Sequence, residues 1–144
     1  MSTHKSPKIK TLLEELDVSA SHEKFDRRYL GFFECFNRQL YYESHDVLED
    51  LWLEVKGDRC FFFYKGLIQL AGAFVHLKKG KLNPAARLFR LSLKNISNFQ
   101  PVTLELDVKT LVSRMNQWLE VLEKSDYTRS PYNPAKPPVL KLTP

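Results

Sequence analysis

The chain has 144 residues, a length typical of one domain that buries its core without disulfides or metals. Hydrophobic residues make up 43% of the chain and aromatic residues 12%, which excludes a wholly disordered protein. The formal net charge of +5 permits weak contact with polyanions, but small domains often carry such a charge for solubility. Nucleic-acid binding is therefore only a third, weaker hypothesis.

Three segments with helical periodicity occupy the first part of the chain. The first, at residues 8–18, is short and amphipathic. The second, at residues 23–38, has aromatic residues at a spacing of three or four, typical of a stripe facing a core. Gly31 weakens this helix by up to ~1 kcal/mol relative to alanine but allows close packing. The third contains His45 and ends near Gly57, where glycine favours a helix stop.

Residues 58–79 form a fourth helix that is apolar almost all round, which places it at the centre of a bundle. Lysine, glutamine and histidine interrupt its longest apolar stretch, so we expect a buried helix and no membrane span. Gly80 closes it. Asn83 and Pro84 then predict the start of a fifth helix, with asparagine as N-cap and proline at the first helical position. Pro101 ends that helix.

A last helix opens at Asp107 and ends near residue 124, beyond which five prolines between 131 and 144 exclude a regular helix. No useful strand alternation is visible. The sequence therefore predicts an all-α, single-domain bundle of five to six helices. We expect an N-terminal segment at residues 1–22, a bundle core at 23–124, and an extended Pro-rich C-terminal tail at 125–144 that packs on the bundle.

Two cysteines, Cys35 and Cys60, fall in helical segments and lack the spacing of metal ligands. A disulfide between them is one alternative, but two small core residues in a reducing compartment fit better. The first ten residues contain no apolar run, so no secretory signal is expected. These features predict a cytoplasmic protein.

The most informative stretch is residues 41–52. As a helix it places His45, Glu49 and Trp52 at about 0°, 40° and −20°, at the edge of the face that enters the core. Ionisable groups near a core are destabilising unless they are paired, bonded or ligated. The other acidic residues of this region fall on the opposite, solvent side: Glu43, Asp46, Asp50 and Glu54.

A polar strip also follows the apolar fourth helix. Lys65, Gly72 and His76 lie within about 60° of Gln69 on its surface. We expect this strip to face the edge that carries His45 and Glu49, because two polar seams can satisfy each other.

Two interpretations of these residues compete. In the first, His45, Glu49 and His76 bind a divalent metal of unspecified identity, with His45 and Glu49 as catalytic residues of a hydrolase. In this interpretation the pocket or second shell comprises Glu43, Trp52, Lys65 and Gln69. In the second, a non-enzymatic scaffold or interaction module uses His45, Glu49, Gln69 and His76 as a hydrogen-bond network that sets helix register. The stronger metalloprotease pattern HExxH is absent.

Several blocks of residues recur in the order and spacing of a known family. They are Phe36-Asn37, Tyr41-Tyr42-Glu43-Ser44-His45-Asp46, Leu48-Glu49, Trp52, Gly66-Leu67-Ile68-Gln69-Leu70-Ala71, His76, Gly80 and Ala85. Over residues 29–99 the chain resembles domain of unknown function 309. The resemblance implies an all-α fold and an unsettled function, although members are sometimes labelled metal-dependent hydrolases. The matching polar residues are Glu43, His45, Glu49, Gln69 and His76.

The chain departs from the family pattern at three places. Gln39 stands where the family favours glycine. Asp46 replaces the glutamate that follows the histidine, and its shorter arm argues against a ligand role. In the turn after the fourth helix, Lys81 and Pro84 replace the usual asparagine and glycine.

A basic stripe lies outside the fifth helix and at its entrance: Arg87, Arg90, Lys94, Lys78, Lys79 and Lys81. A charge run of this kind is usually a solvated face, and it lacks the interleaved aromatic residues that stack on bases. A phosphate-bearing partner is the alternative interpretation. The remaining partners that the sequence allows are a small molecule, another protein or a second copy of the chain.

Overall fold

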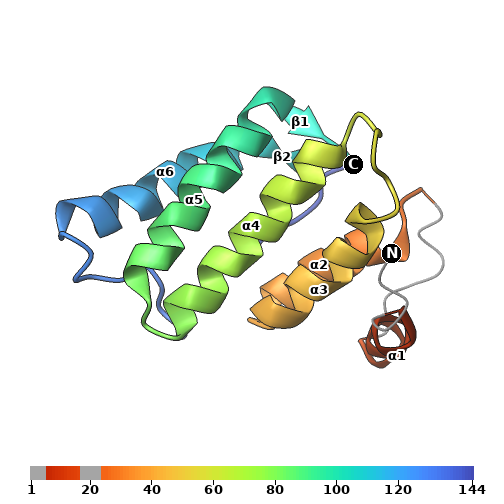
Figure 1. The fold of residues 1–144 in the computed structure, drawn as a ribbon, viewed down its shortest axis with the longest axis horizontal. Coiled ribbons are helices and arrows are strands. Elements are labelled where there is room, and N and C mark those ends of the chain that lie inside the picture. The colour runs from red at the N-terminus through yellow and green to blue at the C-terminus, as the bar shows by residue number, and fades with distance from the viewer. Residues whose placement is uncertain (1–5, 17–23) are drawn as a thin grey trace.

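The computed structural model describes residues 6–16 and 24–144. Its six α-helices, one 3-10 helix and two short strands are, in chain order, α1 (Ser6–Glu15), α2 (Arg27–Asn37), α3 (Tyr41–Trp52), α4 (Phe61–Lys78), α5 (Leu82–Ile96), the 3-10 helix η1 (Ser97–Phe99), β1 (Val102–Thr103), β2 (Leu106–Asp107) and α6 (Val108–Lys124). Figure 1 shows α3, α4 and α5 side by side, with α2 behind α3 and α6 beyond α5. The predicted all-α class is confirmed. None of the helices in the described ranges is long and apolar enough to cross a membrane.

The short antiparallel pair β1–β2 was not predicted. Each of its strands has two residues, too few to produce the alternating pattern by which a strand is recognised in sequence. The predicted opening of the last helix at Asp107 is confirmed. Asp107 is the N-cap of α6, and its carboxylate accepts a hydrogen bond from the backbone N–H of Thr110 at 2.9 Å.

The predicted start of α5 is wrong. The helix begins at Leu82 with Lys81 at the N-cap position, so Pro84 lies at the third helical position. The reason is the turn that ends α4. Gly80 adopts a φ of +73°, and the N–H of Lys81 donates to the carbonyl of His76 at 2.9 Å. This bond closes α4 and leaves α5 free to start at the next residue.

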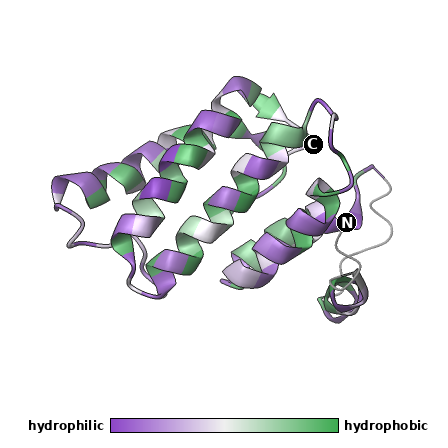
Figure 2. Ribbon diagram, viewed as in Figure 1, coloured by the Kyte–Doolittle hydropathy of each residue, from purple (hydrophilic) through white to green (hydrophobic). Residues whose placement is uncertain are grey.

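The core lies around α4, as predicted from its apolar surface. Phe74 on α4 makes edge-to-face contacts with Phe36 on α2, Phe89 on α5 and Trp118 on α6, at centroid distances of 5.3, 5.7 and 5.1 Å. Figure 2 shows hydrophilic and hydrophobic positions alternating along α5, whereas long apolar and neutral stretches cover α4. One helix thus joins three others through a single aromatic residue.

Close contact between α4 and α5 depends on Gly66. A Cβ atom added there would lie 2.1 Å from Ile96 Cγ2 and 3.3 Å from the Ser92 carbonyl oxygen. The buried Ser92 hydroxyl donates to the Gly66 carbonyl at 2.6 Å. The two helices therefore approach at backbone distance here, which fixes their relative level.

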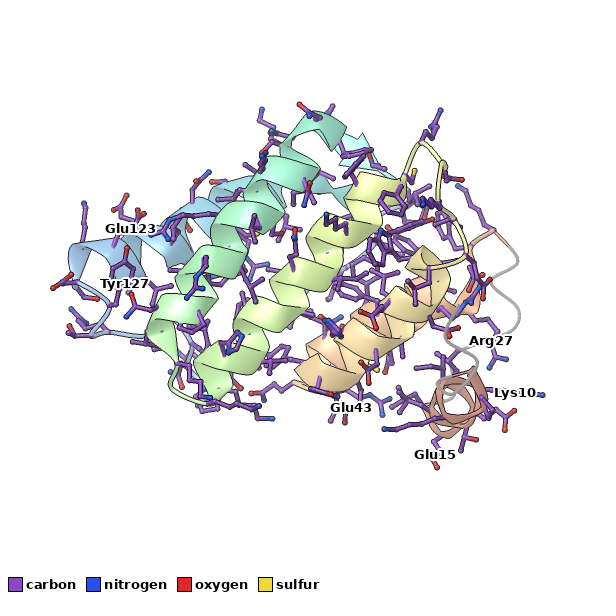
Figure 3. The ribbon with its side chains drawn as sticks, in the orientation of Figure 1. Lys10, Glu15, Arg27, Glu43, Glu123 and Tyr127 are labelled. Atoms are coloured by element: carbon purple, nitrogen blue, oxygen red, sulfur yellow. The ribbon has the colours of Figure 1, made fainter. Side chains whose placement is uncertain are left out.

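Helix α1 packs on a separate, smaller cluster. Ile9, Leu13 and Leu16 cover Cys35 on α2 and Val47 on α3, and all five are buried. The predicted close packing at Gly31 is confirmed, because an added Cβ atom would lie 2.3 Å from Leu13 Cδ2. Figure 3 shows Lys10 and Glu15 on the outer side of α1.

An ion cluster ties the start of α2 to the end of α3. Arg28 donates to Asp50 at 2.8 Å, to Glu54 at 2.7 Å and to Asp26 at 2.9 Å. Asp50 is only 5% exposed, so its predicted position on the solvent side of α3 is wrong. The helical wheel could not show that a neighbouring helix covers this side of α3 and supplies an arginine.

Residues 125–144 contain no helix and contact the bundle at several points. Asn37 holds Leu140 through two hydrogen bonds of 2.8 Å, one to its carbonyl and one from its N–H. Leu140 is buried, and Leu142 pairs with Leu106 beside the β1–β2 pair. The side-chain amide of Asn37 thus pairs with the backbone of Leu140 in the way that a neighbouring strand would.

Gly66→Ala should destabilise the protein by about 1–3 kcal/mol, because the new methyl group would overlap the buried Ile96 side chain and press on the Ser92 carbonyl. Gly72→Ala is the matched control on the same helix. Its Cβ would meet only the flexible Leu88 Cδ1, at 3.0 Å. That variant should be neutral or up to about 1 kcal/mol more stable, through helix propensity. Urea unfolding of both variants tests the assignment, and equal effects would contradict it.

Arg28→Ala should destabilise the protein by about 3 kcal/mol at pH 7, because it removes the cation that compensates the buried Asp50. Arg38→Ala, which breaks an exposed pair with Glu34, should change stability by about 0.5 kcal/mol or less. Chemical unfolding measures both. A loss as large for Arg38→Ala as for Arg28→Ala would refute the importance of the cluster.

The Arg28 effect should depend on pH. Burial tends to raise the pKa of Asp26, but hydrogen bonds from Arg28 and its charge outweigh burial and lower it. The hydrogen bond from Arg28 also lowers the pKa of Glu54. At a pH above the pKa values that Asp26 and Glu54 have in the unfolded chain, both groups therefore stabilise the fold. This stabilisation is lost as the pH falls through the lower pKa values that they have in the folded protein. The difference between wild type and Arg28→Ala should shrink below about pH 4, measured by unfolding at a series of pH values.

Candidate functional site

The His45 imidazole lies between two carboxylates of the same helix. Its Nδ1 is 3.2 Å from Asp46 Oδ1, and its Nε2 is 3.9 Å from Glu49 Oε2. The side chains of His45, Asp46 and Glu49 are 32%, 14% and 25% exposed. All three are therefore shielded in part but open to solvent.

These three residues form the one group of potential metal ligands found in the described ranges. One donor atom from each lies within 4.8 Å of the others. Nitrogen and oxygen donors bind divalent metals at about 2.0–2.2 Å, so ligand atoms around one ion stand about 3–3.5 Å apart. The observed spacing needs only small side-chain rotations to reach this geometry.

Asp46 is the member that the sequence did not predict. Adjacent residues on a helix do not face each other, which is why the helical wheel placed Asp46 on the solvent side. In the structure its side chain is only 14% exposed and bends towards the imidazole. The shorter arm of aspartate does not prevent this contact, because the imidazole extends towards it.

The level of α3 against α4 follows from two aromatic contacts. Trp52 stacks on Phe61 at 4.9 Å, and Tyr41 contacts Phe74 at 5.1 Å. The helices are antiparallel (Figure 1), so each step along one helix is matched by a step back along the other. This count places Lys65 level with Glu49 and Gln69 level with His45.

Gln69 nevertheless bonds to the other side of α4. Its amide oxygen accepts a hydrogen bond of 2.7 Å from Asn95 on α5. The predicted polar strip thus lies at the level of His45. Its central residue, Gln69, forms its hydrogen bond with Asn95 of α5 instead of with α3. The sequence alone could not reveal Asn95 as the partner, because it does not show which residues of α5 lie beside Gln69.

The structure separates the other predicted site residues. Lys65 lies over the Phe62 ring at 5.9 Å. The Trp52 Nε1 is buried without a hydrogen-bond partner among the described residues. Figure 3 shows Glu43 at the start of α3, on the side where α1 lies.

His76 lies outside the group formed by His45, Asp46 and Glu49. Its Nδ1 is buried and has no hydrogen-bond partner among the described residues. Burial lowers the pKa of the ring, and the positive charges of Lys81, Lys79 and Arg87 lower it further. The same charges would repel a divalent cation, so these surroundings do not favour a metal ligand at this position.

Residues 29–88 match the family described as Domain of unknown function (DUF309). Over this segment the chain is similar to DUF309. The match confirms the resemblance seen in the sequence and spans α2, α3, α4 and the start of α5. No curated protein and no solved structure matches the chain significantly.

The backbone at Gln39, where the sequence resemblance favours glycine, is left-handed. The residue adopts a φ of +62°, in the left-handed region that glycine enters without strain. The glutamine side chain makes contacts that glycine cannot make. It bonds with the Tyr132 hydroxyl, and its Nε2 donates to the Pro134 carbonyl at 3.3 Å. This chain thus accepts a strained residue that binds its own C-terminal segment.

Gln39→Gly should be more stable than Gln39→Ala by about 1 kcal/mol, because both variants lose the tail contacts and only glycine relieves the left-handed strain. In both variants, amide hydrogen exchange at residues 132–140 should accelerate relative to wild type. Thermal unfolding and exchange mass spectrometry provide the two readouts. Equal stability of the two variants would show that the positive φ carries no strain.

Proposed function

We propose that the protein binds a divalent metal ion on α3 through His45 Nε2 and Glu49, with Asp46 orienting the imidazole. The observation that supports this most directly is the position of the ring, with one nitrogen facing each carboxylate. Metal-binding histidines commonly donate their other N–H to a carboxylate, which fixes the tautomer and the ring orientation. Asp46 is placed to accept that hydrogen bond from Nδ1.

Two protein ligands leave most positions around the ion open. A divalent ion with open positions polarises a substrate and activates water for hydrolysis. The partial exposure of His45 and Glu49 gives substrate access to this position. We therefore propose a metal-dependent hydrolase, in which Glu49 and His45 hold the ion. Lys65, level with Glu49, is positioned to meet negative charge on a substrate.

The second candidate is a non-enzymatic scaffold or interaction module. The hydrogen bond between Gln69 and Asn95 favours this role for α4, because it satisfies the polar strip inside the bundle. Phe62 and Leu53, near the α3–α4 turn, are 52% and 40% exposed and offer an apolar surface to a partner.

Metal binding can be measured by titrating chelator-treated protein with Zn²⁺, Mn²⁺, Fe²⁺ and Ni²⁺ while following Trp52 fluorescence in a Trp118→Phe background. At least one metal should give saturable quenching, because Trp52 lies one turn from Glu49. His45→Ala and Glu49→Ala should abolish it, and Asp46→Asn should weaken affinity by about 10–100-fold.

Glu120→Gln is the matched control, because this carboxylate is 62% exposed on α6 and pairs only with Lys124 in the described part of the chain. It should bind metal as wild type does. If none of the four metals binds, the metal proposal is refuted. If His45→Ala and Glu49→Ala also lower the melting temperature, the scaffold interpretation is favoured.

Hydrolysis needs its own test. With metal bound, the protein should hydrolyse a generic activated ester or phosphodiester, and Glu49→Gln should abolish the activity. Metal binding without hydrolysis of either substrate class would support the metal site and reject these two reactions.

A further inference from the structure

The turn between α4 and α5, at the lower end of these helices in Figure 1, gathers positive charge around one imidazole. His76 is a partly buried residue in the last turn of α4, next to the buried Leu77, and Lys79 and Lys81 follow it in the turn. The backbone N–H groups of both lysines donate to the His76 carbonyl, at 3.1 and 2.9 Å. The turn is therefore closed on the backbone carbonyl of His76.

Arg87 joins this group from α5. The Gln69–Asn95 hydrogen bond sets the level of the two antiparallel helices. His76 lies seven residues further along α4 than Gln69, and Arg87 lies eight residues before Asn95 on α5. Both intervals are about two helical turns. Arg87 is therefore level with His76.

The cations of this turn lack acidic partners. None of Lys79, Lys81 and Arg87 forms an ion pair with a carboxylate in the described ranges, and all three are exposed. Arg90 differs, because it bonds to Glu123 at 3.1 Å and to the Tyr127 hydroxyl at 2.7 Å. Figure 3 shows both of these partners at the far end of α6. Lys79, Lys81 and Arg87 thus bring three cations without a described carboxylate partner to one turn.

The His76 ring is suited to donate to an anion. Its buried Nδ1 has no hydrogen-bond partner in the part of the chain that the structure describes, and an unbonded N–H is more destabilising than an unbonded acceptor. We therefore assign the proton of the neutral ring to Nε2. The residue is only partly buried and Nδ1 is its buried nitrogen, so we place Nε2 on the more accessible side of the ring. Burial and the neighbouring cations keep the ring neutral, as its lowered pKa indicates.

We propose that His76, Lys79, Lys81 and Arg87 bind a phosphate group, carried by inorganic phosphate or by a small soluble phosphate ester. A phosphate dianion offers several strong acceptor oxygens for three cations and one N–H donor. The planar guanidinium of arginine matches two of these oxygens at once, and lysines act as mobile point charges. A single carboxylate would leave part of the positive charge unpaired. This site is independent of the metal site on α3.

The test is an NMR titration of the full chain with inorganic phosphate and with adenosine monophosphate, at constant pH and ionic strength. Amide signals of residues 76–87 should shift saturably, and adenosine should leave them unchanged. The double variant Lys81→Ala/Arg87→Ala should weaken binding by at least about tenfold, and His76→Phe by about tenfold. All of these residues are at the surface or partly buried, and circular dichroism checks that the variants remain folded.

The matched control is Lys136→Ala/Lys141→Ala, which removes the same charge from exposed positions elsewhere. It should bind phosphate as wild type does. Binding of inorganic phosphate alone, or of both probes, supports the site and identifies which form of phosphate it accepts. The proposal would be overturned if the control weakened binding equally or if the shifts did not saturate. It would also be overturned if the protein were retained on a heparin column but bound neither probe.

Discussion

The burial of α4 between α3 and α5 is the constraint on which the rest of the structure depends. Its apolar surface requires neighbours on every side, and Gly66 lets α5 approach until Ile96 and Ser92 touch the α4 backbone. The Trp52–Phe61 stack sets the level on the other side. Once both levels are set, Gln69 meets Asn95 on α5, and Lys65 lies level with Glu49 on α3.

Two sites of opposite charge result from this arrangement. On α3, two carboxylates flank one imidazole, which favours a cation. At the α4–α5 turn, the positive charges of Lys81, Lys79 and Arg87 act on another imidazole, which favours an anion. The two histidines occupy opposite electrostatic environments, although the sequence grouped His45 and His76 in one metal site. A protein with both sites would be able to hold a metal and a phosphate group at separate positions.

The C-terminal segment adds a feature outside the DUF309 match. Asn37 and Gln39, both within the matched residues, form hydrogen bonds with Leu140 and with Pro134 and Tyr132. The left-handed backbone of Gln39 is tolerated because its side chain gains these contacts. A motif position that favours glycine for backbone reasons has thus become an attachment point for the tail in this chain.

Local sequence was sufficient for the helices, because the periodicity of apolar residues and the cap at Asp107 depend on neighbours within a few residues. It also identified His45 and Glu49 as neighbours, since residues four apart share a helix face. Where the contact came from another element, sequence was insufficient. The burial of Asp50 requires Arg28, the bond of Gln69 requires Asn95, and the surroundings of His76 require the α4–α5 turn. The spacing of apolar residues that predicts a helix is local in the sequence. The partner of a side chain, in contrast, depends on how helices that are distant in the chain pack against each other.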